Sequence, residues 1–544
     1  MIKKLQILFI IIFLFCLQSS QKTDDDHFEI SKNLKIMASV YEKLFDHYVD
    51  EVIPGRVMKK GIDAMLKSLD PYTVYISESQ IEDFRFTTTG EYGGIGATIK
   101  KLNNKMVVTE IFESSPAFKA GVLAGDEIVT IDKIKIIDKN IEEVGTLLKG
   151  PSQSKILLEV KREGKVIYKN LVREDIQIPA VSLFKMMSNH IGYIKLNSFT
   201  TTASSEFKKA FLSLNEKGLK KLIIDLRSNG GGLLNEAVKI VNLFVPKGEL
   251  VVSTKSRNKQ MNRNYICRDH PLDTNIPIIV LIDEMSASAS EIVAGSLQDL
   301  DRAVIVGNTS YGKGLVQQTK HVSFGGQIKL TVAKYYTPSG RCIQKIDYSN
   351  QEKSGFGKIE DSLVKKFTTK NGREVTDSRG IEPDFKVEQD YFNAITEALL
   401  KEEIIFNYTN KIISSYDTIV LSKFSFSDSS YQHFVDYVLR QELKYQTASN
   451  FHFEELKEVA IKEKYLKENM ELFTRMEKKF KTDVKKDLLR HKEEIKFFIE
   501  NEIISRQHFQ KGRVEASLFK DPCILESKKL FDNNNNEYSN TLKK

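Results

Sequence analysis

The spacing of apolar residues changes several times along the chain, and each change predicts a different kind of structure. Between residues 30 and 84, apolar side chains such as Ile36, Val40 and Leu44 recur at the spacing of an α-helix. The turn Asp70-Pro71-Tyr72-Thr73 interrupts this pattern, because proline ends a helix and favours a turn. We therefore expect an N-terminal helical segment over residues 28–86.

The next segment, residues 87–174, has the pattern of a compact β-rich domain. Short runs of β-forming residues, at 97–99, 106–108 and 156–160, are separated by turns that glycine marks. Such short strands with regular turn signals are typical of a small β-sheet structure rather than of helices.

Residues 175–389 alternate between the two patterns. Predicted strands at 192–196, 222–225 and 278–282 are separated by predicted helices at 204–218 and 233–244. Strands that alternate with helices pack as an α/β layer around a largely parallel sheet. We expect this part of the chain to be the α/β core.

The rest of the chain is rich in lysine and glutamate with helical spacing. Apolar residues such as Leu456, Val459 and Leu472 lie on one face of the predicted helices, which indicates an amphipathic helical domain over residues 390–532. The asparagine run 533–536 then predicts a disordered tail over residues 533–544.

The first 20 residues have the order of a secretory signal peptide. Lys3 and Lys4 precede an apolar run at 7–15, and a short polar stretch follows. The run is too short to span a bilayer comfortably. We expect an exported protein, in the periplasm or on the outer face of the cytoplasmic membrane. An uncleaved N-terminal anchor is the alternative, and a lipid anchor on Cys16 is a lesser one because bulky Phe15 precedes it.

Composition narrows the class of protein. The chain has 544 residues, so we expect several folding units, and 41% hydrophobic with 28% charged residues is ordinary for globular proteins. The net charge of +8 is spread along the chain, which does not favour nucleic-acid binding. The four cysteines have no paired spacing, so neither a zinc site nor a disulfide framework is expected, although pairing of Cys267 with Cys342 stays open.

A run of small residues at 283–294 is the first candidate for chemistry. It follows an apolar strand and leads into a helix, and it contains Ser286, Ser288 and Ser290. Free amide groups and the helix dipole at such a turn favour negative charge, which suits a nucleophile and the oxyanion that it generates. The alternative is that these serines only cap the helix, as most serines in this position do.

Lys313, between Gly312 and Gly314, is the candidate base that a serine nucleophile needs. Lysine accepts a proton when burial lowers its pKa. Gln317 would share a face with Lys313 in a strand, where it could hold the amine. Residues 307–313 also match most of a phosphate-binding loop, but Gly314 stands where a hydroxyl should bind magnesium, so nucleotide binding is disfavoured.

Two glycine-rich loops are candidates for binding through backbone amides. The loop 225–232 ends in three glycines between a strand and a helix, and its amides could form half of an oxyanion hole, or the loop could be a plain turn. The loop 92–96 precedes a strand, and its amides could bind a peptide carboxylate while the strand pairs with the peptide. Residues 115–122 and 124–132 complete a helix-turn-strand unit after it.

Taken together, these segments resemble the carboxyl-terminal processing peptidases, also called tail-specific proteases, which are Ser/Lys peptidases with an inserted PDZ domain. The resemblance covers residues 30–384 and includes the turn 69–72, the PDZ signature, the segments 225–232 and 286–292, Lys313 with Gln317, and residues 336–341. Glu284 and Met285 depart from the family pattern, which has glycines there. The resemblance implies a Clp-protease/crotonase-like α/β core.

By this resemblance Ser288 is the nucleophile, Lys313 the general base and Gln317 its orienting partner. The oxyanion hole would use the amide of Ala289 with that of Gly231 or Gly232. The substrate C-terminus would bind the PDZ loop at Gly94, Ile95 and Gly96. No metal or other cofactor is implied.

The expected function is therefore cleavage of proteins near their C-termini after capture by the PDZ domain. Expected partners are proteins or peptides with free C-termini. An adaptor or activator, membrane association through the N-terminus and oligomer formation stay open. The alternative from another class is a PDZ scaffold or chaperone that kept the protease fold without turnover.

Overall fold

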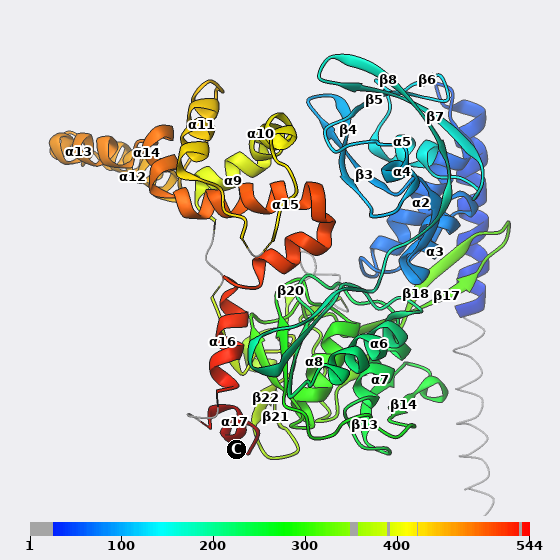
Figure 1. The fold of residues 1–544 in the computed structure, drawn as a ribbon. Helices are drawn as coiled ribbons and strands as arrows, with labels where there is room; N and C mark the ends of the chain where they lie inside the picture. Colours follow the sequence, from blue (N-terminus) through cyan, green and yellow to red (C-terminus); the bar gives the residue numbers. More distant parts are fainter. Residues whose placement is uncertain (1–25, 349–356, 389–391, 422, 533–535, 544) are drawn as a thin grey trace, which may run out of the picture.

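The structure is a computed structural model that describes residues 26–348, 357–388, 392–421, 423–532 and 536–543. The predicted signal peptide, residues 1–20, and Cys16 lie outside these ranges. Within them, no helix has both the length and the apolar composition needed to cross a membrane. Figure 1 shows an α/β core, a β-rich domain above it, helices at the N-terminal end and a separate group of C-terminal helices.

The core contains a six-stranded sheet that is parallel except at one edge. Its strands, in spatial order, are β10 (Val181–Met186), β11 (Ile191–Leu196), β12 (Lys221–Asp225), β15 (Ile278–Ile282), β16 (Val304–Gly307) and β23 (Phe385–Lys386). Only β10 runs antiparallel to its neighbour. The predicted α/β core with a largely parallel sheet is confirmed.

Both faces of this sheet are covered, which explains its continuous apolar strands. Alternate side chains of β15 point to opposite faces, so Val280 and Leu281 belong to two different buried clusters. The cluster with Val280 includes side chains of α6 (Ala203–Glu216), α7 (Leu234–Asn242) and α8 (Ala289–Asp299). The cluster with Leu281 includes side chains of α16 (Pro522–Leu530) and, packed against it, of α17 (Glu537–Lys543).

A second sheet brings the N-terminal segment to the core. Strand β18 (Gln327–Tyr336) pairs with β1 (Val74–Ile76), β13 (Leu250–Lys255) and β17 (Leu315–His321), and β13 also pairs with β14 (Arg263–Ile266). Thus the predicted N-terminal helical segment also supplies one short strand. Smaller hairpins are formed by β19 (Ile346–Asp347) with β20 (Gly357–Lys358), and by β21 (Lys366–Thr368) with β22 (Glu374–Thr376).

The β-rich domain has its own buried core and is joined to the rest by a pair of strands. Its sheet has the order β3-β4-β5-β7-β8, so β3 lies at an edge. The elements are β3 (Ala97–Leu102), β4 (Lys105–Ile111), α4 (Pro116–Lys119), β5 (Glu127–Ile131), β6 (Ile134–Lys135), α5 (Ile141–Leu148), β7 (Lys155–Arg162) and β8 (Lys165–Val172). Strands β2 (Glu91–Gly94) and β9 (Glu174–Gln177), where the chain enters and leaves, pair with each other.

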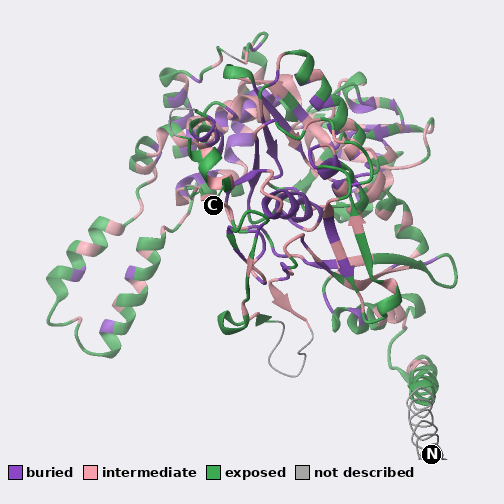
Figure 2. Ribbon diagram, turned by 90° about the horizontal axis from the view of Figure 1, so that it is seen from below, coloured by how far each residue is buried: buried purple, intermediate pink, exposed green. Residues whose placement is uncertain are grey.

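The N-terminal helices are a helix over residues 26–47, α2 (Pro54–Lys67) and α3 (Ile81–Thr89). Most side chains of the first helix are exposed, and Figure 2 shows it standing away from the body of the protein. Helix α3 ends at Gly90, which has φ +75°, a conformation that glycine adopts without steric cost. The β-rich domain begins directly after this residue.

The C-terminal helices are mostly a separate domain with its own core, as predicted. They are α9 (Ala394–Lys401), α10 (Ile404–Ile412), α11 (Asp428–Leu439), α12 (Ala448–Lys462), α13 (Met470–Phe480), α14 (Val484–Arg490) and α15 (Lys492–Ser517). Helices α12 and α13 form a hairpin that projects into solvent (Figure 2) and has only a small apolar cluster around Phe453 and Phe473.

The predicted disordered tail, residues 533–544, is wrong for residues 537–543, which form helix α17. The hydroxyl of Tyr538 contacts the backbone of Ile278 on β15, accepting from its amide at 2.8 Å. Leu542, four residues on, packs on the same apolar cluster. The sequence did not predict this helix, because the asparagine run directly before it is typical of disordered segments. The last part of the predicted helical segment 390–532 also reaches the core sheet, because Leu518, Ile524 and Leu530 belong to a buried cluster on it.

Candidate active site

Ser288 lies at the turn between strand β15 and helix α8, as the sequence predicts. It is the N-cap residue of α8, and its backbone has φ +56° and ψ −110°. Non-glycine residues rarely adopt positive φ, and such strain is found most often at functional sites. Every residue of α8 is buried, so the helix that carries Ser288 is held firmly. The hydroxyls of Ser286 and Ser290 donate to the backbone carbonyls of Leu226 and Asn229, as structural residues do.

A single buried carboxylate, that of Glu291, joins the serine to the loop of Lys313. One oxygen, Oε2, accepts hydrogen bonds from the amide of Ser288 at 2.7 Å and from the amide of Lys313 at 2.9 Å. The other oxygen accepts from the hydroxyl of Ser310 and the amide of Gly312. Burial raises the pKa of Glu291, while these four hydrogen bonds lower it. The carboxylate therefore fixes the backbones of both candidate catalytic residues relative to each other.

Lys313 is half-buried and forms no ion pair within the described part of the chain. Burial, together with the positive charge of Lys329, lowers the pKa of the Lys313 amine to about 8, although Glu291 and Asp70 act in the opposite direction. A lysine with this pKa is partly neutral near pH 7, which a general base requires. Lys329, on β18, also lines the cleft, and burial lowers its pKa as well.

The amine of Lys313 rests on an aromatic ring from the N-terminal segment. Its Nζ lies 4.2 Å from the ring centroid of Tyr72, a cation–π distance. The turn that carries Tyr72 is fixed by Asp70, whose carboxylate accepts from the amides of Tyr72 and Thr73 at 2.8 Å each. Thr73 in turn accepts from the amide of Thr331 on β18. The turn therefore belongs to the site rather than only ending a helix.

Gln317 lines the same cleft as Lys313, but the two do not share a strand face. Strand β17 begins at Leu315, after Lys313, and a β-bulge lies between Val316 and Gln317. The side-chain amide of Gln317 donates to the hydroxyl of Thr331 at 3.2 Å. Within the residues that the structure describes, neither Gln317 nor Ser288 is hydrogen-bonded to the amine of Lys313.

The glycine loop after β12 lies directly against Ser288. A Cβ added to Gly231 would lie 2.9 Å from Cβ of Ser288 and 3.0 Å from the amide nitrogen of Ala289, so only glycine fits. Gly231 donates its own amide to the side chain of Asn229 at 2.9 Å. Gly232 has φ +144° and is exposed at the cleft. Of the two amides that the sequence left open, that of Gly231 is already engaged.

These residues surround one cleft with a volume of about 380 Å³. Its walls include the following groups: Gly231 and Gly232 of the glycine loop, Ser288, Lys313, Gln317 and Lys329, and the α3 residues Phe84, Thr87 and Thr88. Ala289 is fully buried behind them. Of the residues described, no group of three or more His, Cys, Asp or Glu is placed to hold a metal ion.

The predicted carboxylate loop of the β-rich domain, Gly94, Ile95 and Gly96, begins at the last residue of β2 and leads into the edge strand β3. Gly96 has φ +72°, and an added Cβ would lie 2.3 Å from Cβ of Ser115. The ring of Tyr92 covers Gly94, and the amide of Gly96 is hydrogen-bonded to the Tyr92 hydroxyl. Burial raises the pKa of Tyr92 to about 12 despite this bond. A peptide carboxylate that reached Gly96 would therefore have to displace Tyr92.

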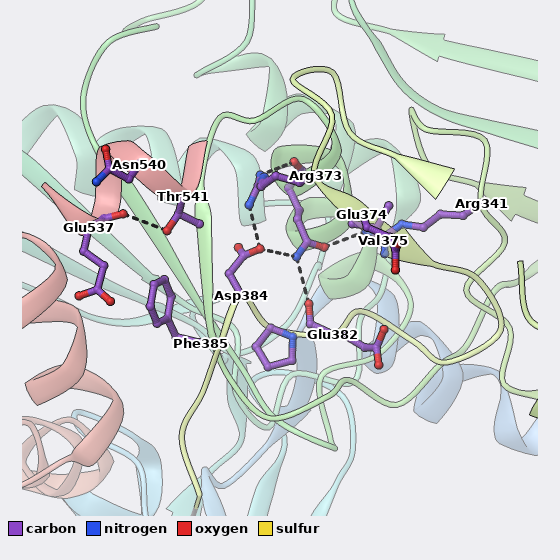
Figure 3. A pocket seen from close by; sticks show the side chains of 12 residues that line it. Arg341, Arg373, Glu374, Val375, Glu382, Asp384, Phe385, Glu537, Asn540 and Thr541 are labelled. Atoms are coloured by element: carbon purple, nitrogen blue, oxygen red, sulfur yellow. Dashed lines mark hydrogen bonds and ion pairs between the residues drawn. The ribbon is translucent and has the colours of Figure 1, made fainter. Parts of the chain in front are cut away.

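A second pocket, of about 760 Å³, lies between α17 and the segment around β22 and β23 (Figure 3). Two buried arginines line it, and both are paired. Arg341 contacts Asp299 at 2.8 Å, and Arg373 contacts Asp301 at 2.6 Å and Asp384 at 2.8 Å. The charges of both arginines in this pocket are therefore balanced by carboxylates.

Sequence reasoning missed Glu291 and Lys329. Glu291 stands three residues after Ser288, which is the spacing at which a side chain returns to the N-cap amide, so a signal was present. No sequence signal pointed to Lys329, because only the pairing of β17 with β18 brings this residue to the cleft. Cys267 and Cys342 are both free thiols, so the pairing that the sequence left open is not formed.

Comparison with protein families gives three matches along the chain. Residues 190–352, which contain Ser288 and Lys313, match Peptidase family S41. Residues 93–171 match the PDZ domain family, and residues 395–531 match "Probable PDZ-protease, C-terminal helical domain". The β-rich domain is therefore a PDZ domain inserted before a peptidase core.

Curated relatives match more than half of this chain. A carboxy-terminal-processing protease of Bartonella bacilliformis is 38% identical over 321 residues, which are 58% of this chain and 73% of that protein. A probable CtpA-like serine protease of Staphylococcus aureus is 34% identical over 313 residues, which are 57% of this chain and 62% of that protein. Among solved structures, the photosystem II D1 C-terminal processing protease is 25% identical, with a TM-score of 0.35 over 64% of this chain and 92% of that one.

Proposed function

Because the chain belongs to the carboxy-terminal-processing proteases of Peptidase family S41, we propose that it is exported and cleaves protein substrates near their C-termini through Ser288 and Lys313. The family membership makes the chain a serine peptidase with a PDZ domain. The finer proposal concerns which residues act, how the substrate is held and where the reaction takes place.

The observation that carries this proposal is the amine of Lys313 in the cleft of Ser288, which has no ion-pair partner among the residues that the structure describes. A buried lysine without a carboxylate partner loses its proton far more readily than an ordinary one, and the pKa of about 8 expresses this. Glu291 holds both residues through their backbones, so it orders the pair without neutralising the amine by direct contact. A scaffold without turnover would need neither feature.

In the proposed reaction Ser288 Oγ attacks the scissile carbonyl carbon while neutral Lys313 takes the hydroxyl proton. The tetrahedral oxyanion is bound by backbone amides; we assign Ala289 and Gly232, because Asn229 already occupies the amide of Gly231. Lys313 returns its proton to the leaving amine as the C–N bond breaks. Water then attacks the acyl-enzyme, with Lys313 again as base, and frees Ser288.

Two rearrangements accompany this reaction. The Lys313 amine must leave the ring of Tyr72 to reach Ser288, a movement that a four-carbon side chain allows. Gln317 orients the amine in the engaged position by exchanging its bond to Thr331. We therefore propose that the contact of Lys313 with Tyr72 belongs to a resting arrangement of the site.

Substrate capture is assigned to the PDZ domain. A substrate C-terminus would add a strand to the open edge of β3, and its carboxylate would bind the amides at Gly94, Ile95 and Gly96 after Tyr92 moves away. Because the order of residues at the N-terminus is that of a signal peptide, the proposed location is the periplasm or the outer face of the cytoplasmic membrane.

The test uses the purified mature chain and a loosely folded substrate with a free apolar C-terminus. We expect cleavage, labelling of Ser288 by a fluorophosphonate, and loss of both in Ser288→Ala. The exposed Ser205 serves as the matched control, and Ser205→Ala should retain full activity. Labelling at Ser286 or Ser290 in place of Ser288 would refute the choice of nucleophile. Equal cleavage of the C-terminally amidated substrate would refute carboxylate capture.

A further inference from the structure

The chain returns to the peptidase core at its C-terminal end. After the helical domain, residues 518–521 lead into α16, which lies along the core sheet (Figure 1). Asp521 is the N-cap residue of α16 and accepts a hydrogen bond from the amide of Ile524 at 3.1 Å. Only one of its carboxylate oxygens is used in this way.

The other oxygen of Asp521 pairs with Arg227, in the loop that carries the proposed oxyanion hole. Nη1 of Arg227 lies 2.8 Å from Oδ2 of Asp521, and both side chains are about 15% exposed, at 14% and 15%. The remaining nitrogens of the guanidinium bind Asp225 at 3.0 and 2.6 Å. Arg227 is therefore held from two sides, by its own strand β12 and by the C-terminal helix.

Arg227 lies at the start of the glycine loop, so its position determines where the first residues of the loop lie. Its carbonyl accepts from Lys195 at 2.6 Å. The next residue, Ser228, has φ +59° and donates its amide to Asp283. The loop then runs through Gly231, which lies against Ser288, to Gly232. A shift of Arg227 would be transmitted along these few residues to the amide of Gly232.

We propose that Asp521 is a positioning residue for peptide hydrolysis, which holds Arg227 and through it the oxyanion-binding loop. This inference rests on the proposed function. By this inference the C-terminal end of the chain affects the rate of hydrolysis, although no residue of α16 lines the cleft. Asp521 acts through Arg227 and does not contact the substrate.

The chain offers a closely matched control. Asp483 is the N-cap residue of α14 and accepts from the amide of Lys486 at 3.0 Å, but α14 lies in the helical domain and Asp483 has no arginine partner among the described residues. Asparagine caps helices about as well as aspartate does. Asp521→Asn and Asp483→Asn thus preserve both caps, and only the first removes a charge that faces Arg227.

The experiment compares the two variants with wild type in the full mature chain. Rates are expressed per active site titrated by fluorophosphonate. For Asp521→Asn we expect kcat to fall about tenfold, less than the loss of a whole oxyanion donor, with KM changed by less than about twofold. A peptide boronic acid, which forms a tetrahedral adduct with the serine, should bind more weakly by the same factor. Asp483→Asn should match wild type.

Three results would overturn the inference. These are an unchanged kcat in Asp521→Asn, an equal fall in Asp483→Asn, or a fall explained by fewer titratable sites or a lower Tm. The positioning role predicts weaker boronic-acid binding at unchanged Tm, which general destabilisation would not produce. If the proposed function itself were wrong, wild type would show neither labelling nor hydrolysis that depends on Ser288, so the two failures are distinct.

Discussion

The cleft of Ser288 and the pocket beside α17 both contain cationic side chains that are partly or fully buried. The two sites differ in whether carboxylates lie next to these cations. In the pocket, Arg341 and Arg373 each lie within 2.8 Å of a carboxylate. In the cleft, the amine of Lys313 lies 4.2 Å from the ring centroid of Tyr72, and the positive charge of Lys329 also acts on it. The carboxylates in the pocket keep the arginines charged and stabilise the fold. The surroundings of Lys313 in the cleft instead make its amine easy to deprotonate.

This difference separates a structural site from a reactive one better than size does. The arginine pocket has twice the volume of the cleft, about 760 against 380 Å³. Pocket volume therefore does not identify the reactive site. A titratable group whose desolvation is not compensated is the more specific sign of catalysis.

The largest expected effect comes from removing the unpaired amine. Lys313→Met should lower kcat/KM about 10³-fold or more, because no base remains to accept the Ser288 proton. It should also stabilise the fold at pH 7 by about 1 kcal/mol. There the lysine is mainly protonated in both states, and the folded state, with a pKa of about 8, binds that proton less tightly than the unfolded state. Peptide hydrolysis and urea denaturation measure the two effects.

The exposed Lys320 on β17 provides the control for this change. Lys320→Met should leave both quantities at the wild-type values. A Lys313→Met variant that keeps even a tenth of the wild-type activity would contradict the role given to Lys313.

Breaking an ion pair in the arginine pocket should lower the stability of the fold and leave the activity nearly unchanged, which is the opposite of the result expected for Lys313→Met. Asp299→Asn leaves the guanidinium of Arg341, which is 1% exposed, without its charged partner. We expect a loss of about 3 kcal/mol in the free energy of unfolding. The kcat per titrated active site should stay within about twofold of wild type. Lost turnover at full stability would show that this pocket takes part in the reaction.

The smallest effect concerns the second lysine of the cleft. Lys329→Met removes a positive charge that lowers the pKa of Lys313, so that pKa should rise above about 8. Because only the neutral amine acts as base, kcat/KM at pH 7 should fall a few-fold, while the rate at pH 10 changes little. A pH–rate profile measures this shift. Displacement of the profile to lower pH would show that the sign of the interaction is wrong.

The sequence predicted those parts of the site that neighbouring residues determine. The turn at Ser288, the glycine loop and the parallel strands beneath them follow local rules of pattern and spacing. Contacts between distant segments could not be read in this way. Tyr72 reaches Lys313 only because β1 pairs with β18, and Asp521 reaches Arg227 only because α16 returns to the core sheet.

Two sequence predictions failed or changed for similar reasons. The bulge in β17 and its late start place Gln317 off the expected face relative to Lys313, and bulges have no reliable signal in a single sequence. The sequence predicts a disordered tail where helix α17 forms, because the two apolar residues that anchor this helix, Tyr538 and Leu542, follow a polar run. Its stability comes from the sheet on which it packs rather than from its own composition.

The most direct test of the account is the pH dependence of Ser288 acylation, measured as the second-order rate of fluorophosphonate labelling. In wild type the rate should rise with pH through an inflection near the Lys313 pKa of about 8 and then become constant. In Lys313→Met the rate should be low and lack that inflection. An identical inflection in both proteins would contradict the claim that the unpaired amine of Lys313 activates the serine.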